Sequence, residues 1–196
     1  NNQQPDCLIP NLGVRMSAQA APFAVLTDIA QRSRSMAAGL PEQQEAVELW
    51  NGIGFILSGE RYVAPMGEVT EILHVPRFTH VPGVRSFLMG AANVRGRLLP
   101  LVDLATFFDV PRSSRSLRER RVLVVEQGDV FSGLVVDSVL GMQYFAKDSF
   151  RATPDGVPDS VRPFVSGGYE RNEEVWKVFS ATDLVEDERF LDVAQW

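Results

Sequence analysis

The feature that most constrains the fold of this chain is a repeated β-hairpin pattern. Residues 53–57 and 61–66 are two short apolar runs that are separated by Ser-Gly-Glu. Residues 122–126 and 130–136 repeat this arrangement around Gln-Gly-Asp. Short runs rich in Val, Ile, Leu and Phe, joined by a three-residue turn that contains Gly, are typical of β-hairpins. The chain beyond Trp50 is therefore predicted to be mostly β.

The similarity extends beyond the hairpins and indicates an internal duplication. At an offset of 69 residues the matched positions are Gly59 and Gly128, Glu60 and Asp129, Tyr62 and Phe131, and Glu68 and Asp137. Segments 97–104 and 177–184 match at an offset of 80, and each ends in Asp-Leu. Asp103 and Asp183 are expected to cap short helices through their side-chain oxygens. The order hairpin, long strand, loop, strand and Asp-Leu turn thus occurs twice.

The size of one repeat limits the fold that it can adopt. A repeat of about 60 residues holds only a few short strands, too few for an open sheet with protected edges. Closing each repeat into a small barrel removes the exposed edges. We therefore expect two small β-barrels packed side by side, and the structural alternative is a single sandwich.

The N-terminal part of the chain has a different pattern. Residues 23–38 carry apolar side chains on one broad face, and Gly39 and Pro41 follow, so a helix is predicted there. Residues 42–49 are a candidate for a second short helix. The expected organisation is a flexible lead over 1–15 before a start at Met16, a helical extension over 16–49, a β domain over 50–186 and a tail over 187–196.

Composition excludes several classes of partner and location. The net charge of -6 and the pI near 5.0 argue against nucleic acid or an anionic membrane as the main partner. The single cysteine, Cys7, suits a reducing compartment, and no apolar run has the length of a membrane span. No signal-peptide pattern is present, so a cytoplasmic location is expected.

The run at residues 112–121 contains five arginines in ten residues. It contains no aromatic residue of the kind that a nucleic-acid surface would place among its basic side chains. We expect it to be a solvated linker between the two barrels that can also steer an acidic partner.

No catalytic or metal site can be assembled from the sequence. His74 and His80 have no nearby ligand residues at metal-binding spacing, so no metal or other cofactor is expected. The motifs of the common hydrolases, nucleotide-binding loops and metalloproteases are absent. Carboxylates are scattered through the repeats at Glu68, Glu71, Asp103, Asp137 and Asp183. Caps and turn bonds are the structural alternative for them, and the favoured one for Asp103 and Asp183. We predict that the chain is not an enzyme.

One block of the sequence resembles the CheW family of chemotaxis coupling proteins. The family pattern is met by Pro82, Phe87, Gly90, Asn93, Arg95, Gly96, Pro100, Asp103 and Leu104, and residues 133–140 match its second-half signature. The resemblance covers about residues 50–186. It implies two SH3-like five-stranded β-barrels around a shared core, with an N-terminal helical extension in this chain. The extension and segments 45–55 and 62–73 are similar to the PilI-type branch, which serves type IV pili and twitching motility.

The resemblance also implies a function. Family members link the cytoplasmic tip of a chemoreceptor to the regulatory domain of a CheA-type histidine kinase, without chemistry of their own. Two alternatives remain: a stand-alone regulatory module of a two-component phosphorelay, and a small-ligand binder that uses the cleft between the barrels.

The receptor-binding positions that the resemblance implies are Arg95, Glu71, Asn93, Val69 and Gly90. No kinase-binding residue is implied. A receptor tip is a helical hairpin, and a groove with a charged pair suits it, since the planar Arg fork holds carboxylates or carbonyls. The alternative for Arg95 is a turn residue paired with a local carboxylate. For Val69 and Gly90 the alternative is a structural role in packing and turn geometry.

Overall fold

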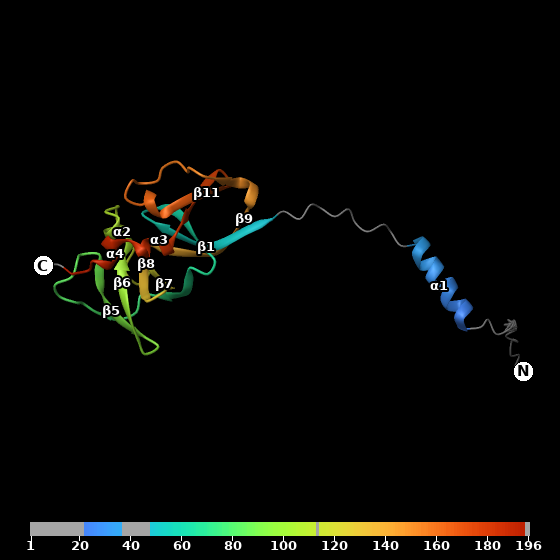
Figure 1. The fold of residues 1–196 in the computed structure, drawn as a ribbon, viewed down its shortest axis with the longest axis horizontal. Coiled ribbons are helices and arrows are strands. Elements are labelled where there is room, and N and C mark those ends of the chain that lie inside the picture. Colours follow the sequence, from blue (N-terminus) through green and yellow to red (C-terminus); the bar gives the residue numbers. More distant parts are fainter. Residues whose placement is uncertain (1–21, 37–47, 113, 195–196) are drawn as a thin grey trace, which may run out of the picture. The chain divides into compact units, whose positions relative to one another are not determined.

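A computed structural model describes residues 22–36, 48–112 and 114–194 of the chain. The chain divides into two units, residues 1–46 and 47–196. The described part of the first unit is helix α1 (Pro22–Met36), which confirms the helix predicted from residue 23 as far as residue 36 (Figure 1). The helix predicted over 42–49 lies mostly outside the described residues. No helix within the described ranges is long and apolar enough to cross a membrane.

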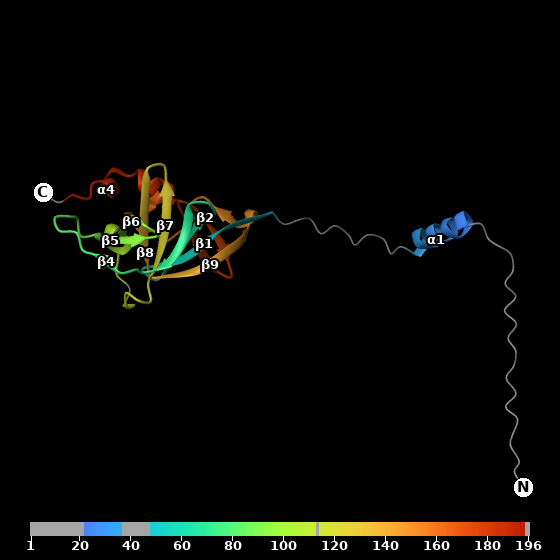
Figure 2. The ribbon, with the colours of Figure 1, turned by 90° about the horizontal axis from the view of Figure 1, so that it is seen from below.

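The second unit contains two sheets, which are named here sheet A and sheet B (Figures 1 and 2). Sheet A has the order β10-β11-β12-β2-β1-β9 and is made of β1 (Leu49–Leu57), β2 (Glu60–Pro65), β9 (Ser138–Ala146), β10 (Phe150–Arg151), β11 (Val165–Arg171) and β12 (Glu174–Phe179). Sheet B has the order β3-β7-β8-β6-β5-β4 and is made of β3 (Val69–His74), β4 (Phe78–Thr79), β5 (Leu88–Val94), β6 (Arg97–Asp103), β7 (Arg121–Gln127) and β8 (Val130–Val136). Each sheet therefore has five strands of at least six residues and one strand of two residues.

Short helices connect and flank these strands. They are α2 (Leu104–Phe107), the 3-10 turns η1 (Lys147–Ser149) and η2 (Arg162–Phe164), α3 (Ala181–Glu186) and α4 (Glu188–Leu191). Segment 187–196, which was expected to be a tail, includes α4. The Phe190 side chain of α4 is buried in the central core, and the Arg85 amide donates to the Val193 carbonyl at 3.0 Å. The packed body therefore continues past residue 186.

The two repeats exchange their hairpins. The β1–β2 hairpin of the first repeat belongs to sheet A with β9–β12, and the β7–β8 hairpin of the second repeat belongs to sheet B with β3–β6. Each hairpin pairs with the other repeat on both of its sides: β2 with β12 and β8 with β6 are parallel, and β1 with β9 and β7 with β3 are antiparallel. The expectation that each repeat closes on itself is therefore wrong. The basic run is also not a linker between barrels, because it joins β6 to β7 within sheet B.

The sheets curl into two barrels that pack on a shared core. In sheet A the ring of Phe145 on β9 stacks on that of Tyr169 on β11 at 5.1 Å, although β12, β2 and β1 lie between these strands in the sheet order. One apolar cluster consists of sheet A residues around Trp176, and another consists of sheet B residues around Leu99. A third and larger cluster combines residues of both sheets with the short helices. The two side-by-side five-stranded barrels are thus confirmed, and the single sandwich is wrong.

The structure aligns the two hairpins with a different offset from the one that the sequence comparison gave. Leu57 and Glu60 flank the first hairpin turn, and Gln127 and Val130 flank the second, which is an offset of 70 rather than 69. An alignment error of one residue matters because neighbouring side chains on a strand point to opposite faces.

The helix caps show a larger difference in register. Asp103 caps α2 by accepting from the Ala105 amide at 3.1 Å, as expected. Asp183 does not cap α3. It lies in the first turn, and Ser180 is the cap, so the equivalent caps are 77 residues apart rather than 80.

Candidate functional site

The segment Asn93–Arg97 contains a tight turn that joins β5 to β6. Val94 pairs with Arg97 in the hairpin, so Arg95 and Gly96 alone form the turn. Their φ angles are +52° and +82°, the conformation of a type I′ turn. The Asn93 side-chain oxygen accepts a hydrogen bond from the Gly96 amide at 2.9 Å, which stabilises the turn. Arg95 therefore adopts a left-handed conformation that residues other than Gly, Asn and Asp rarely adopt.

Arg95 pairs with Glu71 across the end of the sheet B barrel. The Arg95 Nη2 atom is 2.6 Å from the Glu71 Oε1 atom. Glu71 is on β3, and β7, β8 and β6 lie between β3 and β5 in the sheet order, so the pair joins distant strands of the curled sheet. The Arg95 side chain is 78% exposed and that of Glu71 is 26% exposed. The guanidinium is thus held in place and still open to a partner.

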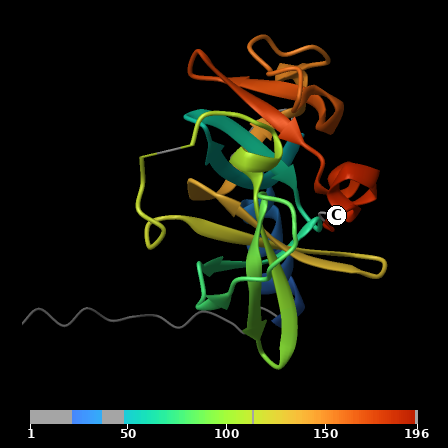
Figure 3. The same ribbon diagram turned by 90° about the vertical axis from the view of Figure 1, so that its left-hand side faces the viewer.

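A second arginine secures the same hairpin from the other side. The guanidinium of Arg97 donates to both oxygens of Glu126 on β7, at 3.1 and 2.9 Å. It also lies over the ring of Phe131 at 3.7 Å. The bonds from Arg97 lower the pKa of the Glu126 carboxyl. The hairpin tip is therefore held by two ion pairs, and Figure 3 shows this hairpin extending from the body of the molecule.

Two of the predicted site residues do not present their side chains at this tip. Val69 begins β3 and packs against the central core. Gly90 is buried at a bulge of β5 with φ at +150°, and a Cβ atom there would lie 2.3 Å from the Thr79 carbonyl oxygen. Structural roles account for both residues. The structure brings together Arg95, Glu71 and Asn93 out of the five predicted positions.

Two exposed apolar residues on β6 and β3, the strands next to and bearing this pair, were missed. Leu98 on β6 is 69% exposed and pairs in register with Asn93. Ile72 follows Glu71 on β3 and is also exposed, and its side chain points to the opposite face of the strand from that of Glu71. Strand alternation could have identified Leu98, because its neighbour Leu99 is an interior position and successive side chains point to opposite faces.

The equivalent hairpin of sheet A provides an internal comparison. Its turn consists of Asn172 and Glu173, with φ angles of +54° and +63°. The position equivalent to Arg95 is therefore occupied by Asn172, a residue that tolerates this conformation well. The turn itself does not require arginine. This comparison favours a role for the Arg95 side chain beyond forming the turn.

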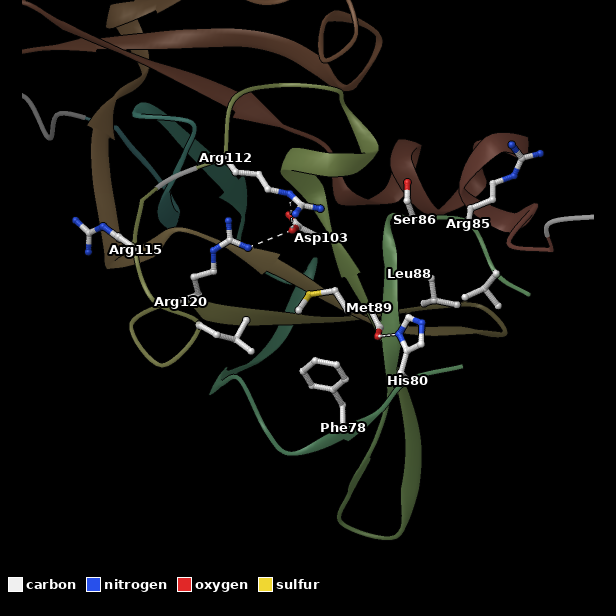
Figure 4. A pocket seen from close by; sticks show the side chains of 12 residues that line it. Phe78, His80, Arg85, Ser86, Leu88, Met89, Asp103, Arg112, Arg115 and Arg120 are labelled. Atoms are coloured by element: carbon white, nitrogen blue, oxygen red, sulfur yellow. Dashed lines mark hydrogen bonds and ion pairs between the residues drawn. The ribbon is translucent and has the colours of Figure 1, made fainter. Parts of the chain in front are cut away.

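The basic run lines a pocket at the other end of the β5–β6 hairpin. The pocket has a volume of about 690 Å³, and residues of the run that line it are Arg112, Arg115, Leu117 and Arg120 (Figure 4). Arg120 is only 8% exposed and bonds Asp103 at 3.2 Å. The expectation of a solvated run is therefore wrong for Arg120, although Arg112, Arg115 and Arg118 are exposed.

Glu68 and His80 have structural partners. A side-chain oxygen of Glu68 accepts from the Ala181 and Thr182 amides at the start of α3, at 2.6 and 3.4 Å. Burial raises the pKa of Glu68. His80 is exposed, and its Nδ1 lies 3.1 Å from the Met89 carbonyl oxygen. Across the described residues, no group of three or more His, Cys, Asp or Glu side chains could hold a metal ion.

Comparisons with known proteins identify related sequences and one related fold. The family model for the CheW-like domain matches residues 51–189. Protein PilI of Pseudomonas aeruginosa is 51% identical over 91% of this chain and 99% of its own length. The chemotaxis protein CheW of Helicobacter pylori is 27% identical over 69% of this chain and 81% of its own. The scaffolding protein TtCheW of Thermoanaerobacter tengcongensis has the same fold, with a TM-score of 0.62 at 24% identity, and the match covers 72% of this chain and 96% of that one.

Proposed function

Because this chain belongs to the CheW-like family, we propose that it is a non-catalytic adaptor that couples a methyl-accepting chemoreceptor to a CheA-type histidine kinase. Its 51% identity to PilI over 91% of the chain supports the further part of this proposal, that the coupling serves the chemosensory system of type IV pili and twitching motility. The adaptor acts in the cytoplasm, where the receptor tip and the kinase regulatory domain are its two protein partners.

The observation that carries the receptor part of the proposal is the Arg95–Glu71 pair at the hairpin tip. The Arg95 guanidinium keeps exposed N–H groups while Glu71 holds its direction. A planar guanidinium that is already oriented loses little freedom when it binds a carboxylate or a carbonyl at the end of a helix. The exposed Leu98 side chain supplies apolar area for a helical hairpin nearby. The receptor-binding set is therefore Arg95 with Glu71, Asn93 and Leu98, supported from inside by Val69 and Gly90.

The geometry gives less support to a small-ligand binder or an enzyme. The carboxylate that lines the pocket of about 690 Å³ is Asp103, and it already accepts from the Ala105 amide and Arg120. A general acid or base must be able to exchange a proton with a bound substrate. The commitment of Asp103 to a cap and an ion pair favours a structural role.

A reconstituted kinase assay tests the proposal. It combines a receptor cytoplasmic fragment, the cognate kinase and the full chain, and it compares the wild type with Arg95→Glu. The wild type should bring kinase output under receptor control. Arg95→Glu should still bind the kinase and should lose most receptor binding, because two like charges would then face each other at Glu71.

Two further variants separate the site from a general charge effect. Arg151→Glu changes another exposed ion pair, with Glu170, on sheet A and should couple normally. The exchange Arg95→Glu with Glu71→Arg restores the pair but reverses its polarity, and should not restore receptor binding. A fully coupling Arg95→Glu variant would show that Arg95 is not part of the receptor site. Absence of coupling by the wild type would contradict the adaptor function.

A further inference from the structure

Three charged side chains are buried together where the two barrels meet, and the proposed receptor site does not use them. They are Arg120, Asp103 and Asp137, and each is at most 8% exposed. Taking such charges out of water is costly, and apolar side chains of similar volume often give an equally stable fold. Stability alone therefore does not explain why the chain places charges here.

Asp137 anchors the cluster to sheet A. It stands between β8 of sheet B and β9 of sheet A, at the point where the chain crosses from one barrel to the other. Its side-chain atom Oδ2 accepts from the Ser58 amide at 2.8 Å, and its own amide donates to the Ile56 carbonyl at 3.0 Å. Both partners belong to the β1–β2 hairpin of sheet A, so the position of Asp137 follows that hairpin.

Asp103 anchors the cluster to sheet B. It is the last residue of β6, its amide donates to the Phe87 carbonyl at 2.8 Å, and its side chain caps α2. Strand β6 begins at Arg97, beside the tip that carries Arg95, and it pairs with both β5 and β8. A displacement of the hairpin tip can therefore reach Asp103 along one paired strand.

Arg120 joins the two anchors, but its two contacts differ. Its Nη1 donates to Asp103 Oδ2 at 3.2 Å, whereas its Nη2 is 3.6 Å from Asp137 Oδ1, which is longer than a charge-assisted hydrogen bond. That Oδ1 atom accepts no hydrogen bond from the described residues. Arg112 also reaches Asp103, at 3.5 Å, so Asp103 keeps a cation when Arg120 moves toward Asp137 (Figure 4). Arg120 thus has a second position open to it.

We propose that Arg120 is a positioning residue for signal coupling: it sets the orientation of one barrel relative to the other, and it tightens on Asp137 when a receptor displaces the hairpin tip. This inference rests on the proposed function, because it supplies the route from the receptor site to the rest of the adaptor. The planar guanidinium suits this role, since its separate N–H groups bond two carboxylates at once. A lysine carries the same charge but presents it as a single point.

Distances between two spin labels test the effect on barrel orientation. The labels are attached to the full chain, in a Cys7→Ser background, at Asp129→Cys in the exposed β7–β8 turn and at Asp148→Cys in the exposed η1 turn of sheet A. The wild-type distance distribution should be narrow and should shift when a receptor fragment binds. Asp137→Asn keeps an oxygen for the Ser58 amide but loses the charge, so its distribution should be broader and should not shift. Superimposable distributions for the two proteins, or no shift of the wild type on binding, would overturn the proposal.

The kinase assay tests the effect on coupling. Asp137→Asn should bind the receptor fragment and the kinase within about twofold of the wild type, because its site is distant from the tip. Receptor control of kinase output should nevertheless fall at least about fivefold. A merely structural role would instead lower the stability and both affinities together. The control Asp187→Asn removes an ion-paired carboxylate whose partner, Arg189, lies in the same short segment, and it should keep receptor control.

Failure of this inference and failure of the proposed function give different results. Absence of receptor control with the wild type contradicts the adaptor function and this inference with it, whereas full control with Asp137→Asn contradicts the inference alone. If Asp137→Asn does not fold, as judged by its unfolding curve, Arg120→Lys takes its place. It keeps the charge but not the planar fork, and it should lose receptor control while it binds both partners. Full control with Arg120→Lys would then overturn the inference.

Discussion

Arg120 donates a hydrogen bond to Asp103 at 3.2 Å, and solvent is almost excluded from both side chains. The same guanidinium lies 3.6 Å from Asp137, which follows β8 of sheet B. Asp137 in turn accepts from the Ser58 amide at 2.8 Å in the β1–β2 turn of sheet A. A residue of the basic run thus supplies the positive charge in a buried network that connects the two barrels.

Replacing Arg120 should strongly destabilise the fold. Arg120→Met leaves the buried carboxylate of Asp137 without its cation and leaves Asp103 with the Arg112 guanidinium at 3.5 Å alone, and the expected loss in the free energy of unfolding is about 3–5 kcal/mol. Denaturant unfolding followed by tryptophan fluorescence measures this loss. Arg118→Met, at an exposed position of the same run, should change the stability by less than about 0.5 kcal/mol. Similar small losses for both variants would show that the buried network contributes little.

Gly90 should be intolerant of any side chain for a structural reason. In Gly90→Ala the added Cβ would lie 2.3 Å from the Thr79 carbonyl oxygen, so β4 or β5 must move. We expect a loss of more than about 2 kcal/mol in the free energy of unfolding. The control is Gly67→Ala, where φ is also positive but no atom lies within 4 Å. Gly67→Ala should cost only about 1 kcal/mol, from backbone strain alone.

The left-handed conformation of Arg95 separates the roles of its backbone and its side chain. Arg95→Asn should change the free energy of unfolding by less than about 1 kcal/mol, because Asn tolerates this conformation and the lost ion pair is exposed. Arg95→Val should cost about 1–2 kcal/mol more, since a β-branched residue is strained there. Both variants should lose receptor coupling in the kinase assay. If Arg95→Asn coupled normally, the guanidinium would have no part in receptor binding.

Glu68 should make the stability of the protein depend on pH. Burial raises the pKa of the Glu68 carboxyl above 4.5 in the folded chain, so the folded state holds this proton more tightly than the unfolded state. Its contribution to stability is full below pH 4.5 and is lost as the pH rises through the folded pKa. The stability of Glu68→Gln relative to the wild type should therefore increase as the pH rises from 4.5 through that pKa.

Glu119 provides a control of opposite sign for this pH dependence. Hydrogen bonds from Ser116 lower the pKa of the Glu119 carboxyl. The contribution of Glu119 is therefore present above pH 4.5 and is lost as the pH falls through the lowered pKa. Relative to the wild type, Glu119→Gln should become less stable as the pH rises. Denaturation curves recorded at several pH values measure both trends, and identical trends for the two variants would contradict the assignment of Glu68.

Local patterns in the sequence determined much of this protein. The Gly-containing turns, the apolar runs and the Asp103 cap depend on a residue and its close neighbours in the chain, so they can be recognised in a single sequence. Self-similarity between the halves predicted a duplicated β fold, and the turn around Arg95 was placed correctly. Even there the offset was 69 instead of 70 in one segment, because the matched residues in the turns are not at equivalent turn positions.

Contacts between distant parts of the chain decided the rest. Which hairpin joins which sheet depends on the pairings of β2 with β12, β1 with β9, β8 with β6 and β7 with β3, and alternation within one strand does not specify its partner. The burial of Arg120 depends on Asp103 and Asp137, which come from two other segments of the chain. The sequence alone therefore predicts a solvent-exposed run of arginines, and the burial of Arg120 follows from the position of these carboxylates in the fold. The curled sheet forms the pocket that the basic run lines. It also brings Arg95 to Glu71, although these residues lie on distant strands of the sheet order.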